Sequence, residues 1–198
     1  MPPWLVLPRV SLRERKKERT RERLVREAVR LFSSQGYEST SVEEIAAAAD
    51  VSPRTFFRYF PTKADVVFAD MPARLEAVRA ALATARFPHD AIRSVVERSL
   101  DFLDDPELLA ARNRLVLASP PLRASLLEFF AQVEGMVMDA YAREGDDELG
   151  SRLAAAITIG AARSALITWT GSGGDLQAIV DRAFRSTAPA VRRVLRGD

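Results

Sequence analysis

The stretch VSPRTFFRYFPTK, residues 51–63, combines four aromatic side chains with three basic ones and no acidic one. Wound as a helix at about 100° per residue, it places Phe56 and Phe60 on one side, with Phe57 at the border. The opposite side carries Arg54, Thr55, Arg58 and Tyr59. We therefore expect a short helix whose aromatic side enters a core and whose basic side is left for a partner.

Signals for helix ends surround this stretch. Three hydroxyl residues stand where a helix N-cap needs an acceptor, each followed by a supporting residue: Ser41 by Glu44, Ser52 by Pro53, and Thr62 by Asp65. They predict helices over 42–49 and 53–59, and a further helix from Lys63. Before them, apolar residues at helical spacing predict a helix over 12–35 that ends at Gly36, with its inner face formed by Leu24, Ala28, Leu31 and Phe32.

Helical spacing continues through the rest of the chain, and no run of alternating β-branched residues indicates a strand. The expected helices cover 63–85, 90–104, 106–118, 122–144, 148–171 and 175–195, separated by proline and glycine positions. Pro72 is expected to kink the first of these. The fold class is therefore predicted to be all-α.

Composition excludes several function classes. The chain has no cysteine and one histidine, and it lacks a glycine-rich phosphate loop and a Glu-x-x-His pair. We therefore expect no enzyme, no metal site and no cofactor. Positive charge is concentrated at the start, because residues 1–30 contain ten lysines and arginines against four glutamates. A basic end of this kind favours a polyanion such as the nucleic-acid backbone.

Two segments bear on localisation. Residues 1–11 contain an apolar run broken by prolines, with basic residues after it, and are predicted to be a disordered arm instead of a signal peptide. Residues 153–174 are long and apolar enough to cross a membrane, but Arg163 stands in the middle of them. We therefore expect this segment to form a buried helix in a cytoplasmic protein that has no membrane contact.

The helices expected at 42–49 and 53–59, joined by Asp50, Val51 and Ser52, are the elements of a helix-turn-helix, whose second helix enters the DNA major groove. The charges of the first helix, RERKKERTRERLVRE, allow two readings. They form either a contact to the DNA backbone or a solvated face held by pairs three and four residues apart.

Residues 40–63, TSVEEIAAAADVSPRTFFRYFPTK, with LFSSQGYESTSV leading into them, resemble the DNA-binding segment of the tetracycline-repressor (TetR) family. The resemblance covers about residues 20–68. It implies a helix-turn-helix DNA-binding domain over 12–62 and a ligand-binding and dimerisation domain over 63–198. It also implies a homodimeric, ligand-responsive regulator, a repressor, that binds a palindromic operator in double-stranded DNA and is released by a small-molecule effector.

The resemblance also implies which residues contact DNA. Three residues at the start of the first short helix would lie near the phosphate backbone: Ser41, Val42 and Glu43. Four residues of the second would face the bases: Pro53, Arg54, Thr55 and Phe57. Tyr59 and Lys63 would bind phosphate, and Arg58 lies on the same exposed face. A lysine at a helix N-terminus is unfavourable for stability, which favours a binding role for Lys63. Two positions depart from the family pattern: Asp50 replaces a frequent glycine, which Asp tolerates in a left-handed turn, and Phe57 replaces a frequent tyrosine.

The larger half offers candidate ligand contacts in its expected helices: Phe102, Asn113, Phe129, Phe130, Val133, Met136, Arg163 and Trp169. The aromatic residues and Met136 fit a plain core as well as a pocket wall. Arg163, expected to be buried, needs either a carboxylate or carbonyl partner across helices or an anionic ligand headgroup. Arg112 is expected to be solvated or at an interface, and His89 is expected at the surface or in a capping role at a loop-to-helix junction.

Residues 148–171 carry two apolar arcs, so one can face the chain's own core and the other a second copy. The expected interface comprises Leu153, Ile157, Gly160, Ser164 and Ile167, with Ile179, Ala183 and Val191 from the last helix. The resemblance implies a dimer through this helix pair. RTFFRYFPTKADV also resembles family members whose effectors are acyl-CoA thioesters, so an acyl-CoA-like or hydrophobic effector is expected. The alternative is a DNA-binding regulator without an effector, whose C-terminal half serves dimerisation or protein contacts.

Overall fold

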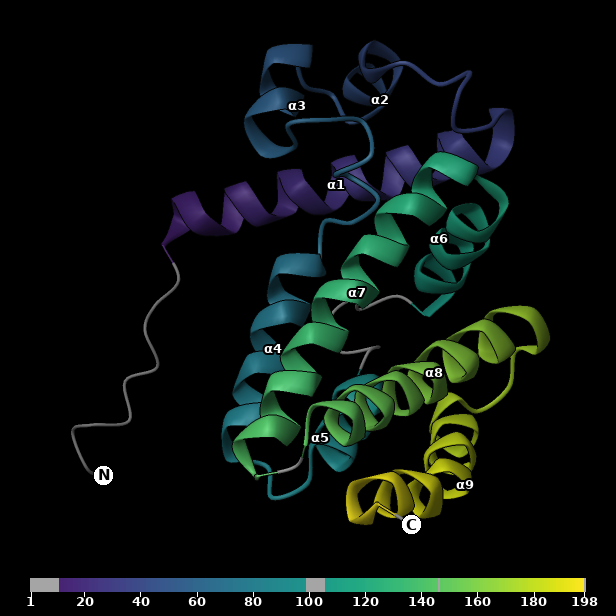
Figure 1. Cartoon of the computed structure of the whole chain (residues 1–198). Coiled ribbons are helices and arrows are strands. Elements are labelled where there is room, and N and C mark those ends of the chain that lie inside the picture. Colours follow the sequence, from purple (N-terminus) through teal and green to yellow (C-terminus); the bar gives the residue numbers. More distant parts are fainter. Residues whose placement is uncertain (1–10, 99–105, 146, 198) are drawn as a thin grey trace, which may run out of the picture. The chain divides into compact units, whose positions relative to one another are not determined.

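The computed structural model describes residues 11–98, 106–145 and 147–197. In these ranges every regular element is a helix, nine in all, and none is a strand, which confirms the predicted all-α class (Figure 1). The chain divides into two compact units, Met1–Ala69 and Asp70–Asp198. The expected domain boundary after residue 62 lies earlier in the sequence than this division.

The first unit contains α1 (Leu12–Gln35), α2 (Val42–Ala48) and α3 (Pro53–Tyr59). Its core is largely apolar and includes Leu24, Ala28, Phe32, Ile45, Phe56, Phe60, Val66 and Val67. Val25 and Val29 complete the buried face of α1, whereas Leu31 is only half-buried. Because helices of seven residues do not persist alone, the aromatic residues of α3 hold it in place. Gly36 ends α1 at φ 91°, as predicted.

The fourth helix begins later than predicted. α4 covers Met71–Thr84, and residues 63–70 form tight turns, with the Val67 N–H donating to the Ala64 carbonyl at 2.9 Å. Pro72 explains the difference, because proline has no N–H for a helical bond to the carbonyl of Phe68 and its ring disfavours that turn. Pro72 thus stands in the first turn of α4 and does not kink its interior. Thr62 and Asp65 still make their expected reciprocal bonds, at 2.7 and 3.3 Å.

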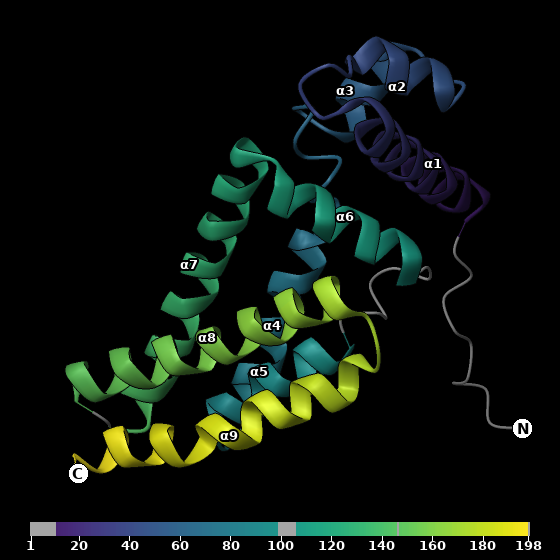
Figure 2. The same cartoon turned by 90° about the vertical axis from the view of Figure 1, so that its right-hand side faces the viewer.

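The second unit contains six helices: α4, α5 (Pro88–Glu97), α6 (Pro106–Ala118), α7 (Pro120–Arg143), α8 (Glu148–Ser172) and α9 (Leu176–Arg196). The end of the helix expected over 90–104 lies outside the described residues. α8 packs along α9 and against α7, as Figure 2 shows. Its inner arc is buried as predicted, with Ala155, Ile159, Ala162 and Trp169 in the core.

Among the described helices, α8 alone has the length and composition of a membrane span. Half of its most apolar window is buried inside the folded chain, as in the core helix of a globular protein.

Candidate nucleic-acid interface

Both short helices of the first unit have the capping contacts that the sequence predicts. The Ser41 hydroxyl accepts the Glu44 N–H at 3.1 Å, and the Glu44 carboxylate accepts the Ser41 N–H at 2.7 Å. The Ser41 N–H, and after it the Ser41 hydroxyl and the Gln35 amide, donate to the Glu44 carboxylate and lower the pKa of Glu44. At α3, the Ser52 hydroxyl accepts the Thr55 N–H at 3.2 Å, and Pro53 occupies the first turn.

The turn between α2 and α3 depends on Asp50. Its φ is 53°, and it is the only non-glycine residue with positive φ in the part of the chain that the structure describes. Its N–H donates to the Ala47 carbonyl at 3.0 Å, and the next N–H, of Val51, donates to the Ala46 carbonyl at 2.9 Å. Asp enters the left-handed region more readily than most residues, so it replaces a turn glycine here as predicted.

The outer face of α3 is the most distinctive surface of the unit. Phe56 and Phe60 are buried, whereas Pro53, Arg54, Phe57 and Arg58 are exposed and Thr55 and Tyr59 are half-buried. Phe57 is 51% exposed although its ring meets that of Phe56 edge-on at 5.6 Å. The helix has no acidic residue, so its outer face presents two guanidinium groups, one apolar ring and hydroxyls. Arginine binds guanine edges, and apolar groups contact thymine methyls.

The other residues expected near DNA lie at the start of α2. Ser41 and Val42 are half-buried and Glu43 is exposed. The Ser41 hydroxyl is already engaged with the Glu44 carboxylate at 2.9 Å, so a phosphate there would compete with the capping box.

Lys63 is half-buried and has several partners within the first unit. Its ammonium donates to the carbonyls of Tyr37 at 2.7 Å and Thr40 at 3.0 Å, with Glu38 at 3.5 Å, and it lies 4.3 Å from the centre of the Tyr37 ring. The helix N-terminus expected at Lys63 is therefore wrong: the residue lies in turns, where its charge meets carbonyls between α1 and α2. The phosphate contact expected of Lys63 stays a prediction.

Two arginines of α1 also have internal partners that the sequence does not reveal. The Arg21 guanidinium donates to the carbonyl of Ala69 and lies 5.7 Å from the centre of the Phe60 ring. The guanidinium of Arg23 donates to the carbonyl of Ala49, at the end of α2. Other charges of α1 form local pairs, such as Arg30 with Glu27 at 2.8 Å. Helix α1 thus combines structural cations with a solvated charged face.

The predicted ligand residues of the second unit are spread over different environments. Val133 and Trp169 belong to the core, while Asn113, Phe129, Phe130 and Met136 are half-buried. Phe102 lies outside the described residues. Arg163, expected to be buried, is exposed and lies 5.7 Å from the centre of the Phe130 ring. It needs no buried counter-charge, because its position on α8 turns it away from the helix's inner arc.

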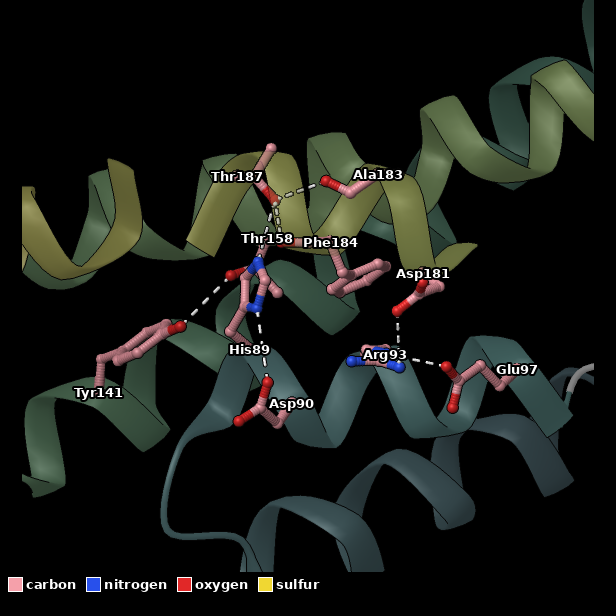
Figure 3. Close-up of polar contacts among 10 residues, drawn as sticks. All are labelled: His89, Asp90, Arg93, Glu97, Tyr141, Thr158, Asp181, Ala183, Phe184 and Thr187. Atoms are coloured by element: carbon pink, nitrogen blue, oxygen red, sulfur yellow. Dashed lines mark hydrogen bonds and ion pairs between the residues drawn. The ribbon is translucent and has the colours of Figure 1, made fainter. Parts of the chain in front are cut away.

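His89, expected at the surface, is instead 1% exposed. Figure 3 shows its ring on α5 beside Phe184 and Thr187 of α9, with Nε2 3.0 Å from the Thr187 hydroxyl. The same hydroxyl also lies 3.0 Å from the Ala183 carbonyl. Nδ1 has no hydrogen-bond partner, and the Asp90 carboxylate lies 3.9 Å away. Aromatic packing on this ring explains its burial.

A buried ionic cluster was also missed. The carboxylate of Asp70 binds the guanidinium groups of Arg74, one turn later on α4, and of Arg112 on α6. All three side chains are nearly inaccessible to water, so the expectation of a surface Arg112 is wrong. Burial alone would raise the pKa of the Asp70 carboxyl, but the two guanidinium groups outweigh it and hold that pKa below 3.8.

The residues expected at a dimer interface lie on α8 and α9. Leu153 is 42% and Ile167 50% exposed, and Gly160 and Ser164 between them are exposed too. Ile157, Ile179 and Ala183 are half-buried. Val191 is an exception, because it is fully buried in the chain's own core and has no surface for a partner.

Comparison with known proteins assigns the family. The family model described as "Bacterial regulatory proteins, tetR family" matches residues 24–69, and that described as "MftR C-terminal domain" matches residues 73–192, more than half of the chain. The HTH-type transcriptional regulator TcmR of Streptomyces glaucescens is 37% identical over 203 residues, covering 95% of this chain and 89% of the relative.

Solved structures agree on the fold. The regulator FadR from Bacillus subtilis, in complex with stearoyl-CoA, has a TM-score of 0.59 at 18% identity and covers 89% of this chain and 98% of its own. The SmeT–triclosan complex has a TM-score of 0.61 at 20% identity, and the match covers 86% of this chain and 90% of that structure's chain. Two family models over successive parts of the chain and a relative of nearly its full length agree: this chain belongs to the TetR family of DNA-binding transcription regulators.

Proposed function

We propose that the protein is a homodimeric transcriptional repressor that binds a palindromic DNA operator through α3 and leaves it when a small molecule binds the second unit. The observation that carries the proposal is the outer face of α3. Arg54, Phe57 and Arg58 are exposed there on a helix without acidic residues, anchored from behind by Phe56 and Phe60. DNA recognition needs such a face, because specificity comes from side chains that reach base edges in the major groove.

Each exposed group has a role in this proposal. Arg54, in the first turn of α3, reads a guanine, and Phe57 contacts a thymine methyl or a sugar. Arg58 and the Tyr59 hydroxyl bind phosphate, and the start of α2 at Ser41 approaches the backbone of the same groove.

Dimerisation follows from the exposed apolar face of α8. In the proposed two-fold arrangement, α8 and α9 of two copies form a four-helix interface around Gly160. Two copies would then place their α3 helices about 34–36 Å apart, the spacing of successive major grooves, on a near-palindromic site.

The effector is proposed to be a small, largely apolar or acyl-CoA-like molecule. Phe129, Phe130 and Met136 are half-buried against the core of the second unit, and Arg163 lies above the Phe130 ring, where a cation would suit an anionic headgroup. Two structural neighbours were solved with stearoyl-CoA and with triclosan. Binding would shift the population of the dimer towards a spacing of its α3 helices that no longer matches DNA.

The decisive experiment selects bound duplexes from a random pool and then repeats the selection with Arg54→Ala. We expect a near-palindromic site, and we expect the variant to lose preference at particular base pairs by about 1–3 kcal/mol each. Arg114→Ala, at an exposed position of the second unit, is the matched control and should select the wild-type site. An unchanged site profile for Arg54→Ala would refute its readout role.

Effector binding is tested by adding fatty acids, acyl-CoA thioesters and apolar metabolites to the selected complex and following release of a labelled duplex. Release by one class supports the proposal and names the effector. If none releases DNA, the second unit serves dimerisation or protein contacts instead. A regulator of this kind would act in the bacterial cytoplasm, where the chromosome lies.

A further inference from the structure

The only histidine of the chain lies buried where α5 meets α9. His89 is 1% exposed, and its Nε2 lies 3.0 Å from the Thr187 hydroxyl of α9. Its ring centroid lies 4.9 Å from that of Phe184 and 5.8 Å from that of Phe87. Figure 3 shows the imidazole directed from α5 towards Phe184 and Thr187 of α9. The ring is thus part of the contact that holds α9 to α5.

The surroundings of this ring suit the neutral imidazole and not the protonated one. A neutral imidazole has one N–H donor and one acceptor nitrogen, whereas a protonated one has two donors. The Nδ1 atom of His89 has no hydrogen-bond partner among the described residues. The Asp90 carboxylate lies 3.9 Å away and is 66% exposed, so water screens its attraction. A second proton would therefore create a buried charge with an unpaired N–H, which is costly.

The charged groups around His89 act in both directions. Burial has the largest effect on the pKa of His89 and lowers it below the ordinary 6.5. Asp90 raises that pKa, whereas Arg192 of α9 and Arg93 of α5 lower it. From α7, the Tyr141 hydroxyl comes into the same region and lies 3.3 Å from a threonine hydroxyl of α8 (Figure 3). Burial and the two arginines together outweigh the one carboxylate.

A proline stands in α9 close to this contact. Pro189 lies inside the helix, two residues after Thr187, and has no N–H for the carbonyl four residues before it. A helix bends most readily where such a bond is missing. On the N-terminal side of the contact, Asp181 of α9 pairs with Arg93 of α5 at 3.0 Å. Loss of the His89 contact would leave α9 attached at Asp181, with its weakest point at Pro189.

We propose that His89 is a proton switch for α9. When the ring takes up a second proton, it leaves its buried site to hydrate its charge, and the contact of α5 with Phe184 and Thr187 opens. The helix then bends at Pro189. Because α9 belongs to the proposed dimer interface, acid would also weaken the dimer and its binding to DNA. This consequence rests on the proposed function, whereas the opening of α9 does not.

Hydrogen exchange of the α9 amides, followed by mass spectrometry at about pH 7.5 and about pH 5.5, tests the opening. One proton separates the closed from the open form, so protection of α9 should fall by up to about tenfold per pH unit below pH 6.5. His89→Gln does not titrate and should protect α9 equally at both pH values. If this variant does not fold, His89→Phe, which keeps an aromatic ring, takes its place. If α9 and α7 exchange at the same rate at about pH 5.5, the whole unit unfolds and the proposal is wrong.

Two exposed charges next to the ring check the direction of the switch. Asp90→Asn removes the group that favours protonation and should move the midpoint of the opening to lower pH. Arg192→Gln removes a group that opposes protonation and should move the midpoint to higher pH. A structural role of His89 alone would leave both midpoints in place. Unmoved midpoints in both variants, or the same response of α9 to pH in wild type and His89→Gln, would overturn the proposal.

Analytical ultracentrifugation at the same two pH values tests the consequence for assembly. The dissociation constant of the dimer should rise in acid for wild type and stay constant for His89→Gln. A rise of the same size in both proteins would refute the link between His89 and the dimer. If the wild-type chain is monomeric at about pH 7.5, the proposed function loses its dimer, whereas hydrogen exchange of α9 still decides whether the switch exists.

Discussion

At the scale of single residues, Asp50 shows how a backbone angle selects a side chain. Its φ of 53° lies in the left-handed region, where most side chains clash with the next carbonyl. Asp and Asn tolerate this region better than other residues, because their short polar side chains bond locally. This conformation was predicted from the resemblance to the TetR family, in which glycine is frequent at this position of the turn.

The effect of replacing Asp50 on stability should therefore depend on how well the new residue tolerates positive φ. Asp50→Val should lower the free energy of unfolding by about 1–2 kcal/mol, because a β-branched residue is strained at positive φ. Asp50→Asn, which keeps the tolerance and removes the charge, should remain close to wild type. Urea denaturation followed by circular dichroism measures both. Equal stability of the valine and asparagine variants would contradict a left-handed turn at this position.

His89 gives a pH dependence of known sign. Burial lowers the pKa of His89 below its ordinary 6.5; Arg192 and Arg93 act in the same direction and Asp90 opposes them. Between the two pKa values the unfolded chain binds a proton that the folded chain does not. Stability should therefore be complete above about pH 7 and fall as the pH drops towards the lowered pKa.

The test compares wild type with His89→Gln between pH 5 and 7. Because His89 is the only histidine of the chain, the variant should show a flatter dependence of unfolding free energy on pH in this window. If wild type and variant showed the same dependence of unfolding free energy on pH, the imidazole would be equally protonated in the folded and the unfolded chain.

At the scale of elements, the ion cluster of Asp70, Arg74 and Arg112 fixes α6 to the start of α4. Asp70→Asn should lower the free energy of unfolding by about 3–5 kcal/mol, because it leaves Arg112 buried without this carboxylate. Since the pKa of Asp70 is held below its ordinary 3.8, the same contribution should disappear in wild type as the pH falls from about 4 through that lowered pKa.

The matched control lies on the same helix. Glu76 pairs with Arg79 at 3.4 Å, but both side chains are exposed, so Glu76→Gln should cost less than about 1 kcal/mol. Thermal unfolding of both variants measures the loss of stability caused by each substitution. A cost for Asp70→Asn as small as that for Glu76→Gln would show that the cluster is solvated in solution.

The elements themselves were largely predictable, whereas the partners of long side chains were not. The helix ends at Ser41, Ser52 and Gly36 depend on bonds within four residues, which spacing reveals. The partner of Lys63 lies 26 residues away in Tyr37, and nothing local distinguishes a backbone carbonyl there from a phosphate outside. The start of α4 was missed for a different reason, because a good cap at Thr62 outweighed the Pro72 signal.

The same limit applies to the second unit. The two arcs of α8 were separable by periodicity, and the inner one is buried as expected. Burial of His89 and exposure of Arg163 were both predicted in the wrong direction, because each depends on how neighbouring helices pack. The spacing of residues shows on which face of its own helix a side chain lies. It does not show which neighbouring helix packs against that face.

At the scale of the whole molecule, the proposed dimer depends on the exposed face of α8. Leu153, Gly160 and Ile167 are exposed there in the single chain, and apolar residues aligned on one helix face are typical of a buried interface. A Cβ added at Gly160 would meet no atom within 4 Å other than its chain neighbours and the nearby backbone of its own helix. A larger side chain at this position therefore has room in the protomer, and in the proposed dimer it would disturb the partner.

Gly160→Leu should weaken the dimer about tenfold or more, because overpacking a close helix contact costs about 1–3 kcal/mol and a two-fold axis applies it twice. Analytical ultracentrifugation over a range of concentrations measures the dissociation constant, and circular dichroism should remain that of wild type. Ala131→Leu, which adds the same bulk at an exposed position of α7, is the control and should leave the dimer intact. An undiminished dimer in Gly160→Leu would place the interface on another face, whereas a wild-type chain that stays monomeric would refute the dimer itself.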